Sequence, residues 1–266
     1  MEYENIKVEP RDGLEILTLN RPGSLNALSS SMVDELADYY DGLERRRDVR
    51  VVVMRGAGRA FCAGLDIKET REDDGSEGRI ARGWRIQTSI CAIMRRMRAI
   101  PQPIVALGHG AACGGGFSLL LASDVRIGAP DLRMNAAYIK IGLGGADMGS
   151  SYLLPRLVGA SLAAELLLTG RFIDAKRALQ RGLLSDVVEQ EKLLDAGLSM
   201  AEEMLSNSPF GLALTKQALV MNIDAQSMDA AVALEDRQQV MLAQMDDHGE
   251  AMTAFVEKRA PRYTGR

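Results

Sequence analysis

Two short apolar runs constrain the fold of this chain more than any other feature. Residues 49–54 form one run, interrupted only by Arg50, and Ile104 to Leu107 form the other. Such runs are typical of strands that are buried on both faces of a sheet. The second run is followed by glycines, a helix expected over 115–121 and a strand expected over 124–127. Strand, glycine turn, helix and strand in this order predict an α/β fold.

The remaining pattern predicts further elements on both sides of these runs. Two strands are expected over 6–9 and 14–20, and Ser29 to Ser31 are expected to cap a helix over 31–47. A charged, glycine-bearing segment over 69–83, expected to be mobile, precedes a helix over 84–98. No clear strand is expected after Val187 and Val188. The chain beyond residue 150 is expected to be almost wholly helical, over 151–157, 161–168, 174–181, 191–206, 209–222 and 225–246.

Length, composition and charge exclude several classes of protein. The chain has 266 residues with 47% hydrophobic content, which suits one large domain or one domain with an appended helical piece. A net charge of −4 and 5% aromatic residues argue against nucleic-acid binding. No apolar run approaches the ~20 residues of a membrane helix, and no secretion leader is apparent. Three cysteines without paired spacing favour a reduced, cytoplasmic protein.

A first glycine bend follows the 49–54 run, at Ala63-Gly64-Leu65-Asp66. Small residues let a ligand approach the backbone closely, and free N–H groups at a strand-to-helix turn are natural donors to an oxyanion. An ordinary tight turn would carry the same residues. The bend alone therefore leaves both interpretations open.

A second bend, Gly114-Gly115-Gly116, opens an apolar helix, where each glycine costs roughly 1 kcal/mol relative to alanine. Close approach of a ligand, N–H donors at a helix N-terminus, or tight packing of helix against strand would each explain this cost. No Gly-Lys-Ser/Thr follows, and the glycine spacing does not fit a dinucleotide-binding fingerprint. A nucleotide cofactor is therefore not expected.

The two bends, together with Asn20-Arg21-Pro22 and Leu25-Asn26-Ala27-Leu28, resemble the crotonase family, also called the enoyl-CoA hydratase/isomerase family. The resemblance runs nearly full length, through Leu157–Ala163, Leu168–Arg171, Ala175–Val188 and Phe255–Pro261. It implies an α/β crotonase-like spiral of ββα units over residues 1–200 and a C-terminal helical trimerisation region over 201–266. It also implies a cytoplasmic enzyme of fatty acid metabolism that acts on an acyl-CoA thioester, needs no separate cofactor and assembles as a trimer or hexamer.

The resemblance also places individual site residues. The oxyanion donors would be the backbone N–H groups of Leu65 and Gly115, which would stabilise the enolate formed when a proton leaves the carbon beside the thioester. Losing one such donor costs about 3–4 kcal/mol in comparable sites. Because the donors belong to the main chain, the side chain of Leu65 is free to vary, although it narrows the pocket. The residues expected to contact the acyl-CoA are Leu25, Ala27, Ala63, Leu65, Asp66, Ile67, Lys68 (at a phosphate) and Tyr138.

The chain departs from the hydratases of this family at two positions. Those enzymes position water with two glutamates, and Ser118 and Tyr138 stand at the corresponding places. A tyrosine titrates near pH 10 and a serine far higher, so neither replaces a carboxylate near neutral pH. Hydration by paired carboxylates is therefore not supported.

One acid, Asp147, remains in the matching stretch. In dienoyl-CoA isomerases and some enoyl-CoA isomerases an aspartate in this stretch shuttles a proton, and one base is sufficient for a double-bond shift. The aroyl-CoA dehalogenases use a similarly placed aspartate as nucleophile, but their tryptophan is replaced here by Tyr138 or Ile139. Asp147 could instead cap a helix over 149–157.

Three hypotheses follow from these residues. An isomerase that uses Asp147 is favoured. The second is a hydratase in which Asp147 or another residue orients the water, and the third is a non-catalytic acyl-CoA-binding protein, motivated by the loss of both glutamates.

The two histidines, His109 and His248, lie far apart in the sequence and do not support a metal site.

Overall fold

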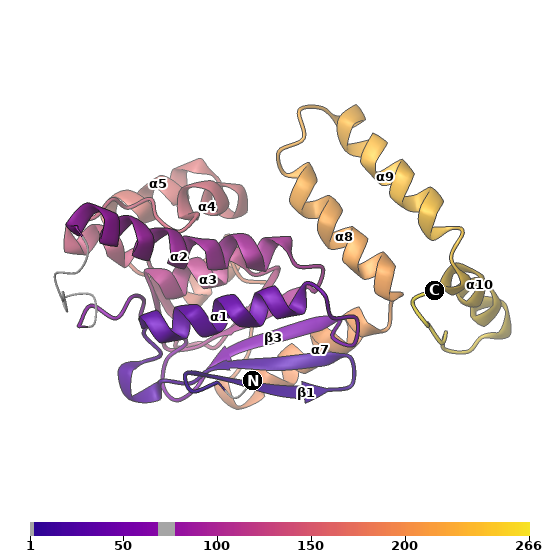
Figure 1. Ribbon diagram of the computed structural model, residues 1–266, viewed down its shortest axis with the longest axis horizontal. Coiled ribbons are helices and arrows are strands. Elements are labelled where there is room, and N and C mark those ends of the chain that lie inside the picture. The colour runs from indigo at the N-terminus through magenta and orange to yellow at the C-terminus, as the bar shows by residue number, and fades with distance from the viewer. Residues whose placement is uncertain (1–2, 69–77) are drawn as a thin grey trace.

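The computed structural model describes residues 3–68 and 78–266 and is centred on a six-stranded sheet of order β1-β2-β3-β4-β6-β9 (Figure 1). β1 and β2 form an antiparallel hairpin, and the other neighbours pair in parallel. The expected strands over 6–9, 14–20, 49–54, 104–107 and 124–127 are confirmed, with ends shifted by one or a few residues. The strands are β1 Ile6–Arg11, β2 Leu14–Leu19, β3 Val51–Gly56, β4 Ile104–Gly108, β6 Val125–Gly128 and β9 Asp186–Val187.

Both faces of this sheet are buried, as the apolar runs predict. In β3, Val51 and Val53 pack with one apolar cluster and Val52 and Met54 with another, because successive side chains of a strand point to opposite faces. The helix α7 (Leu193–Leu205) covers the first face. The second face is covered by α1 (Ser30–Leu43), α2 (Arg79–Ala99) and α3 (Gly115–Ala122) (Figure 1).

A second, three-stranded sheet of order β5-β7-β8 was not predicted from the sequence. Its strands, Ala111–Cys113, Arg133–Asn135 and Ile173–Asp174, are two or three residues long. Segments this short show no periodicity, and β8 overlaps the first residue of the helix expected from residue 174. The sheet matters because it holds the entry to α3: the Gly114 N–H donates to the Asn135 carbonyl oxygen over 2.9 Å.

Three sequence predictions about helix boundaries were wrong, and one of them is the helix expected over 31–47, which ends at Leu43. α2 begins at Arg79, so residues 79–83 of the segment expected to be mobile are helical, while 69–77 lie outside the described residues. Its first turns are exposed, including Ile80 and Trp84, and therefore carry no apolar periodicity. The helix expected over 225–246 ends at Leu242. The helices beyond residue 150 are α4 Ser150–Val158, α5 Ala160–Thr169, α6 Ala175–Gln180, α7, α8 Pro209–Asn222, α9 Met228–Leu242 and α10 Asp246–Glu257.

The helices α8, α9 and α10 extend away from the core (Figure 1). α7 runs through the predicted boundary at residue 200 and packs on the sheet through Leu193 and Ala201, so the extended part begins at α8. Buried Lys216 anchors α8 to the core, because its Nζ lies 2.9 Å from Asp124 Oδ2 and donates to two main-chain carbonyls. Among the described helices, none combines the length and apolar character that crossing a membrane requires.

Candidate active site

The two glycine bends, far apart in the sequence, lie side by side. The segment after β3 pairs with β5, because Cys62 N donates to Ala111 O over 3.1 Å and Cys113 N donates to Cys62 O over 3.0 Å. A Cβ built on Gly64 would lie 2.8 Å from Cys113 O and 3.5 Å from Gly115 N. The fold therefore brings the first bend against the N-terminus of α3.

The main chain of the first bend is fixed on its other side by residues 25–28. Leu28 N donates to Gly64 O over 2.7 Å, and Asp66 N donates to Leu28 O over 2.9 Å. Successive N–H groups of an extended segment point to opposite sides, so the Leu65 N–H points away from Leu28. The Gly115 N–H belongs to the first turn of α3, where N–H groups have no partner within the helix. Within the described residues, neither N–H group has an assigned hydrogen bond.

The glycines of the triplet have different surroundings. A Cβ on Gly116 would lie 2.1 Å from Cys62 O, so this residue is needed for tight packing of α3 against the first bend. A Cβ on Gly115 would meet Leu28 Cδ1 at 2.8 Å and the side chain of Met148 at 3.3 Å. Helix–strand packing, one of the interpretations left open by the sequence, therefore accounts for Gly116. The N–H group of Gly115 is not engaged by this packing and stays available as a donor.

Ser118 and Tyr138, which the resemblance places at the positions of the two glutamates, contact each other. Their hydroxyl oxygens are 3.2 Å apart, and both side chains are buried. Tyr138 lies in a short helical turn, η3 (Ala137–Ile141), beside the triplet. Burial raises the pKa of Tyr138, the nearby Asp147 carboxylate raises it further, and the hydroxyls of Ser118 and Ser150 oppose the shift. The pair therefore stays neutral near pH 7.

Asp147 lies beside this pair, in the segment that leads into α4. Its Oδ1 accepts a hydrogen bond from Met148 N over 2.7 Å and another from the Gln87 side chain. The residue that caps α4 is Gly149, without a side-chain hydrogen bond. The hydroxyl of Ser150 instead accepts from the Asp147 N–H over 3.1 Å. The Asp147 carboxylate therefore does not serve as the helix cap that its sequence position allows.

The residues expected to contact the nucleotide and pantetheine line up along the 25–28 and 63–68 segments. Arg21 joins the two: its Nη1 lies 3.0 Å from Asp66 Oδ2 and donates to the Ala27 carbonyl. Leu25 and Asn26 both adopt positive φ, and the buried Asn26 amide donates to the carbonyls of Ala57 and Ala60. Through its contact with Arg21, the Asp66 carboxylate stabilises the packing of the two segments against each other. The Ile67 and Lys68 side chains are exposed. Ala63 N donates to Leu25 O over 2.9 Å.

A hollow lies beside Leu65, between the first turns of α1 and the face of α2. Leu28, Val33, Ile86 and Ile90 line it together with Leu65 and a few polar groups. The Leu65 side chain forms one wall of this hollow, and polar residues make up as much of its lining as apolar ones. The hollow therefore adjoins the first bend through Leu65.

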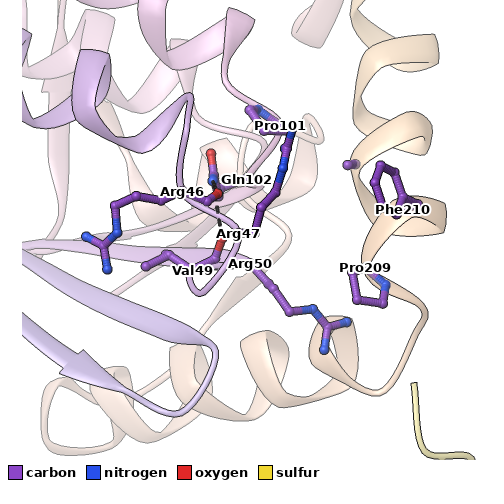
Figure 2. A pocket seen from close by; sticks show the side chains of 9 residues that line it. Arg46, Arg47, Val49, Arg50, Pro101, Gln102, Pro209 and Phe210 are labelled. Atoms are coloured by element: carbon purple, nitrogen blue, oxygen red, sulfur yellow. Dashed lines mark hydrogen bonds between the residues drawn. The ribbon is translucent and has the colours of Figure 1, made fainter. Parts of the chain in front are cut away.

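A second hollow lies at the base of α8 and shares no lining residue with the first (Figure 2). Arg46 and Arg50 come from the α1–β3 connection, and Pro209 and Phe210 from the start of α8. Between them, the Gln102 side-chain amide donates to the main-chain carbonyls of Arg46 and Val49, as the dashed lines in Figure 2 show, and also to that of Leu43. Its position separates it from the two bends, so we do not assign it to the candidate active site.

Three residues of the site were not predicted from the sequence. Gln87 and Cys91 come from α2 and approach Asp147, and Ser150 is buried at the start of α4. Gln87 is separated from Asp147 by 60 residues. No local pattern indicates that an exposed glutamine on a helix faces an aspartate so far along the chain.

The chain matches the enoyl-CoA hydratase/isomerase family over residues 9–266. It is 38% identical over 253 residues to a probable enoyl-CoA hydratase of Mycobacterium leprae, covering 94% of this chain and 86% of that protein. It is 33% identical over 254 residues to the 1,2-epoxyphenylacetyl-CoA isomerase of Escherichia coli, covering 96% of each. The crystal structure of an enoyl-CoA hydratase from Bacillus anthracis superposes with a TM-score of 0.93 at 31% identity, covering 99% of this chain and 100% of that one.

These similarities extend over nearly the whole chain and include both glycine bends. The resemblance seen in the sequence is thereby confirmed, as is the mixed α/β architecture of the crotonase fold. The chain belongs to the crotonase, or enoyl-CoA hydratase/isomerase, family.

Proposed function

We propose that this chain binds an acyl-CoA thioester and holds its carbonyl oxygen between the N–H groups of Leu65 and Gly115. The observation that carries the proposal is the juxtaposition of the two bends, with Gly115 N only 3.5 Å from where a Cβ of Gly64 would lie. The similar proteins named above are described as acting on CoA thioesters, which supports this class of substrate. Main-chain donors fixed by neighbouring segments stabilise an enolate without reorganisation.

The reaction proposed from this enolate is a double-bond shift in which Asp147 acts as the only acid–base group. The Asp147 carboxylate takes the C2 proton of a 3-enoyl-CoA, and the electron pair of that bond is delocalised onto the thioester oxygen. The same carboxyl group then protonates C4, so the thioester is restored with a C2–C3 double bond. One carboxyl group is sufficient because the proton that it removes is the proton that it returns.

The pair formed by Ser118 and Tyr138 favours this reaction over hydration. Both hydroxyls are neutral near pH 7, and burial raises the pKa of Tyr138. The two hydroxyls also form a hydrogen bond with each other, since their oxygens are 3.2 Å apart. A hydratase in which Asp147 orients the water remains the second candidate, because similar proteins carry the name enoyl-CoA hydratase.

The experiment that tests the proposal replaces Asp147 with asparagine and follows 3-enoyl-CoA by mass spectrometry and ultraviolet absorbance. General acid–base catalysis is worth about 10²- to 10⁴-fold, so we expect kcat of Asp147→Asn to fall by that factor while acyl-CoA affinity stays unchanged. Asp131→Asn, at an exposed position outside the site, is the matched control.

Other outcomes would select another hypothesis. Normal turnover by Asp147→Asn would remove Asp147 from the mechanism. If the wild-type protein adds water to a trans-2-enoyl-CoA and does not shift a double bond, the hydratase is correct. Tight binding without turnover of either thioester would identify a non-catalytic binding protein.

We further propose that the chain self-associates as a trimer or hexamer through the helices after residue 201. Several apolar side chains of α8, α9 and α10 are exposed in the single chain: Leu219, Met228, Val240, Phe255 and Val256. An exposed apolar surface of this kind marks an interaction site. Light scattering after gel filtration should give three or six times the mass of 28.9 kDa.

A further inference from the structure

The carboxylate of Asp147 is held asymmetrically. Three donors approach its Oδ1: the Met148 N–H over 2.7 Å, the Gln87 side-chain amide, and the Cys91 Sγ at 4.0 Å. Among residues 3–68 and 78–266, no hydrogen bond is assigned to Oδ2. The two oxygens of the same carboxylate therefore have different surroundings.

Two of these donors come from one face of α2. Gln87 and Cys91 are four residues apart, which places them one above the other on a helix. The Gln87 amide also lies 3.3 Å from the Cys91 Sγ, so it contacts both the thiol and the carboxylate. The thiol remains protonated near neutral pH, because burial and the Asp147 charge raise the pKa of Cys91. α2 thus presents two neutral donors to Asp147.

We propose that Gln87 is a positioning residue that anchors Oδ1 of Asp147 and leaves Oδ2 as the oxygen that takes and returns the substrate proton. The inference rests on the proposed function, since it assumes that Asp147 is the acid–base group. Met148 contributes both the fixed N–H donor to Oδ1 and a side chain that lies against Gly115. The carboxylate and the second bend are consequently connected through one residue.

An anchored carboxylate offers one defined oxygen to two carbons of the substrate. The proton is taken at C2 and returned at C4, which are separated only by C3. One fixed oxygen can reach both carbons without rotation of the carboxyl group. The Gln87 amide is the side-chain donor that fixes this carboxylate from α2. Removing the amide should therefore leave the carboxylate free to rotate.

The test measures kcat and KM for double-bond isomerisation by Gln87→Leu and Gln87→Glu. We expect Gln87→Leu to lower kcat about tenfold, the loss of one hydrogen bond to a charged group, with acyl-CoA affinity unchanged. Gln87→Glu should lower kcat at least as far, because a carboxylate cannot donate to Oδ1. If Gln87 only stabilised the fold, kcat of the folded variants would stay at the wild-type value.

Thr88→Ala is the matched control, because the Thr88 hydroxyl bonds only to main-chain carbonyls of its own helix among the described residues. It should leave kcat and KM unchanged. If Asp147→Asn is inactive but Gln87→Leu retains the wild-type kcat, the inference about Gln87 is overturned and the proposed function stands. If Asp147→Asn is active, the proposed function fails and the inference fails with it.

Discussion

The two glycine bends and the cluster around Asp147 lie at one site but are built in different ways. The bends are held by main-chain hydrogen bonds between neighbouring segments, such as the 2.7 Å bond from Leu28 N to Gly64 O. The cluster consists of side chains that α2, η3 and the segment before α4 bring together. The bends therefore depend on where the backbone runs, whereas the cluster depends on which side chains are present.

This difference explains how one family can accommodate several reactions. Backbone donors survive side-chain substitution, so Leu65 can vary without loss of the N–H group. Acid–base side chains do not survive it, and Ser118 and Tyr138 stand where the resemblance places the two glutamates of the hydratases. Similar proteins are named both hydratase and isomerase, which fits a shared enolate-stabilising site with exchangeable side chains around it.

The largest expected effect comes from breaking the bends themselves. In Gly116→Ala the new Cβ would lie 2.1 Å from Cys62 O, so α3 must move away from the first bend. Overpacking of a core costs about 1–3 kcal/mol and occasionally more, and we expect the upper end of this range because the obstacle is backbone. Urea denaturation measures the change in the free energy of unfolding.

Gly83→Ala is the control for that variant, since no described atom lies within 4 Å of a Cβ there. Gly83 occupies an exposed turn of α2, where alanine should stabilise the helix by about 1 kcal/mol. Equal stability of the two variants would show that the bends do not need glycine at position 116.

A smaller effect is expected when the hydrogen-bonded pair of Ser118 and Tyr138 is changed. Tyr138→Phe keeps the ring but leaves the buried Ser118 hydroxyl without its partner, which should destabilise the fold by about 1–3 kcal/mol. Turnover should fall tenfold at most, far less than in Asp147→Asn, since the hydroxyl transfers no proton. A loss as large as that of Asp147→Asn would instead place Tyr138 in the proton transfer.

The smallest effect concerns Lys68, the exposed residue that lies shortly after the first bend. Lys68→Ala should raise KM for a CoA thioester about threefold, as expected for an exposed ion pair, and the effect should shrink as salt is added. A pantetheine thioester that lacks the nucleotide should be unaffected, and Lys192→Ala should match the wild type. An equal change in KM for both thioesters would remove Lys68 as a phosphate contact.

The features predicted correctly from the sequence are local. Ser29 caps α1 and accepts from Met32 N over 3.1 Å, as its position before an amphipathic segment indicates. The buried strand β3 was recognisable because its apolar residues are consecutive. The second bend was recognisable because three consecutive glycines open a helix at a cost in helix propensity, and the first because small residues follow a buried strand.

The features missed depend on distant contacts or on very short segments. The contact between Gln87 and Asp147 spans 60 residues, and that between Ser118 and Tyr138 spans 20. Neither leaves a periodic pattern in the sequence. The interpretation of Asp147 as a helix cap followed local preference, but Gly149 occupies the cap, and the tertiary contact to α2 engages the carboxylate instead.

The most direct test of the enolate site uses a thioester that can lose a C2 proton but cannot shift a double bond, such as an arylacetyl-CoA in D₂O. Mass spectrometry follows deuterium entering C2. We predict exchange by the wild-type protein and by Asp131→Asn, and none by Asp147→Asn, although all three bind the thioester. Binding by the wild-type protein without any exchange at C2 would contradict the proposal that this site forms and stabilises an enolate.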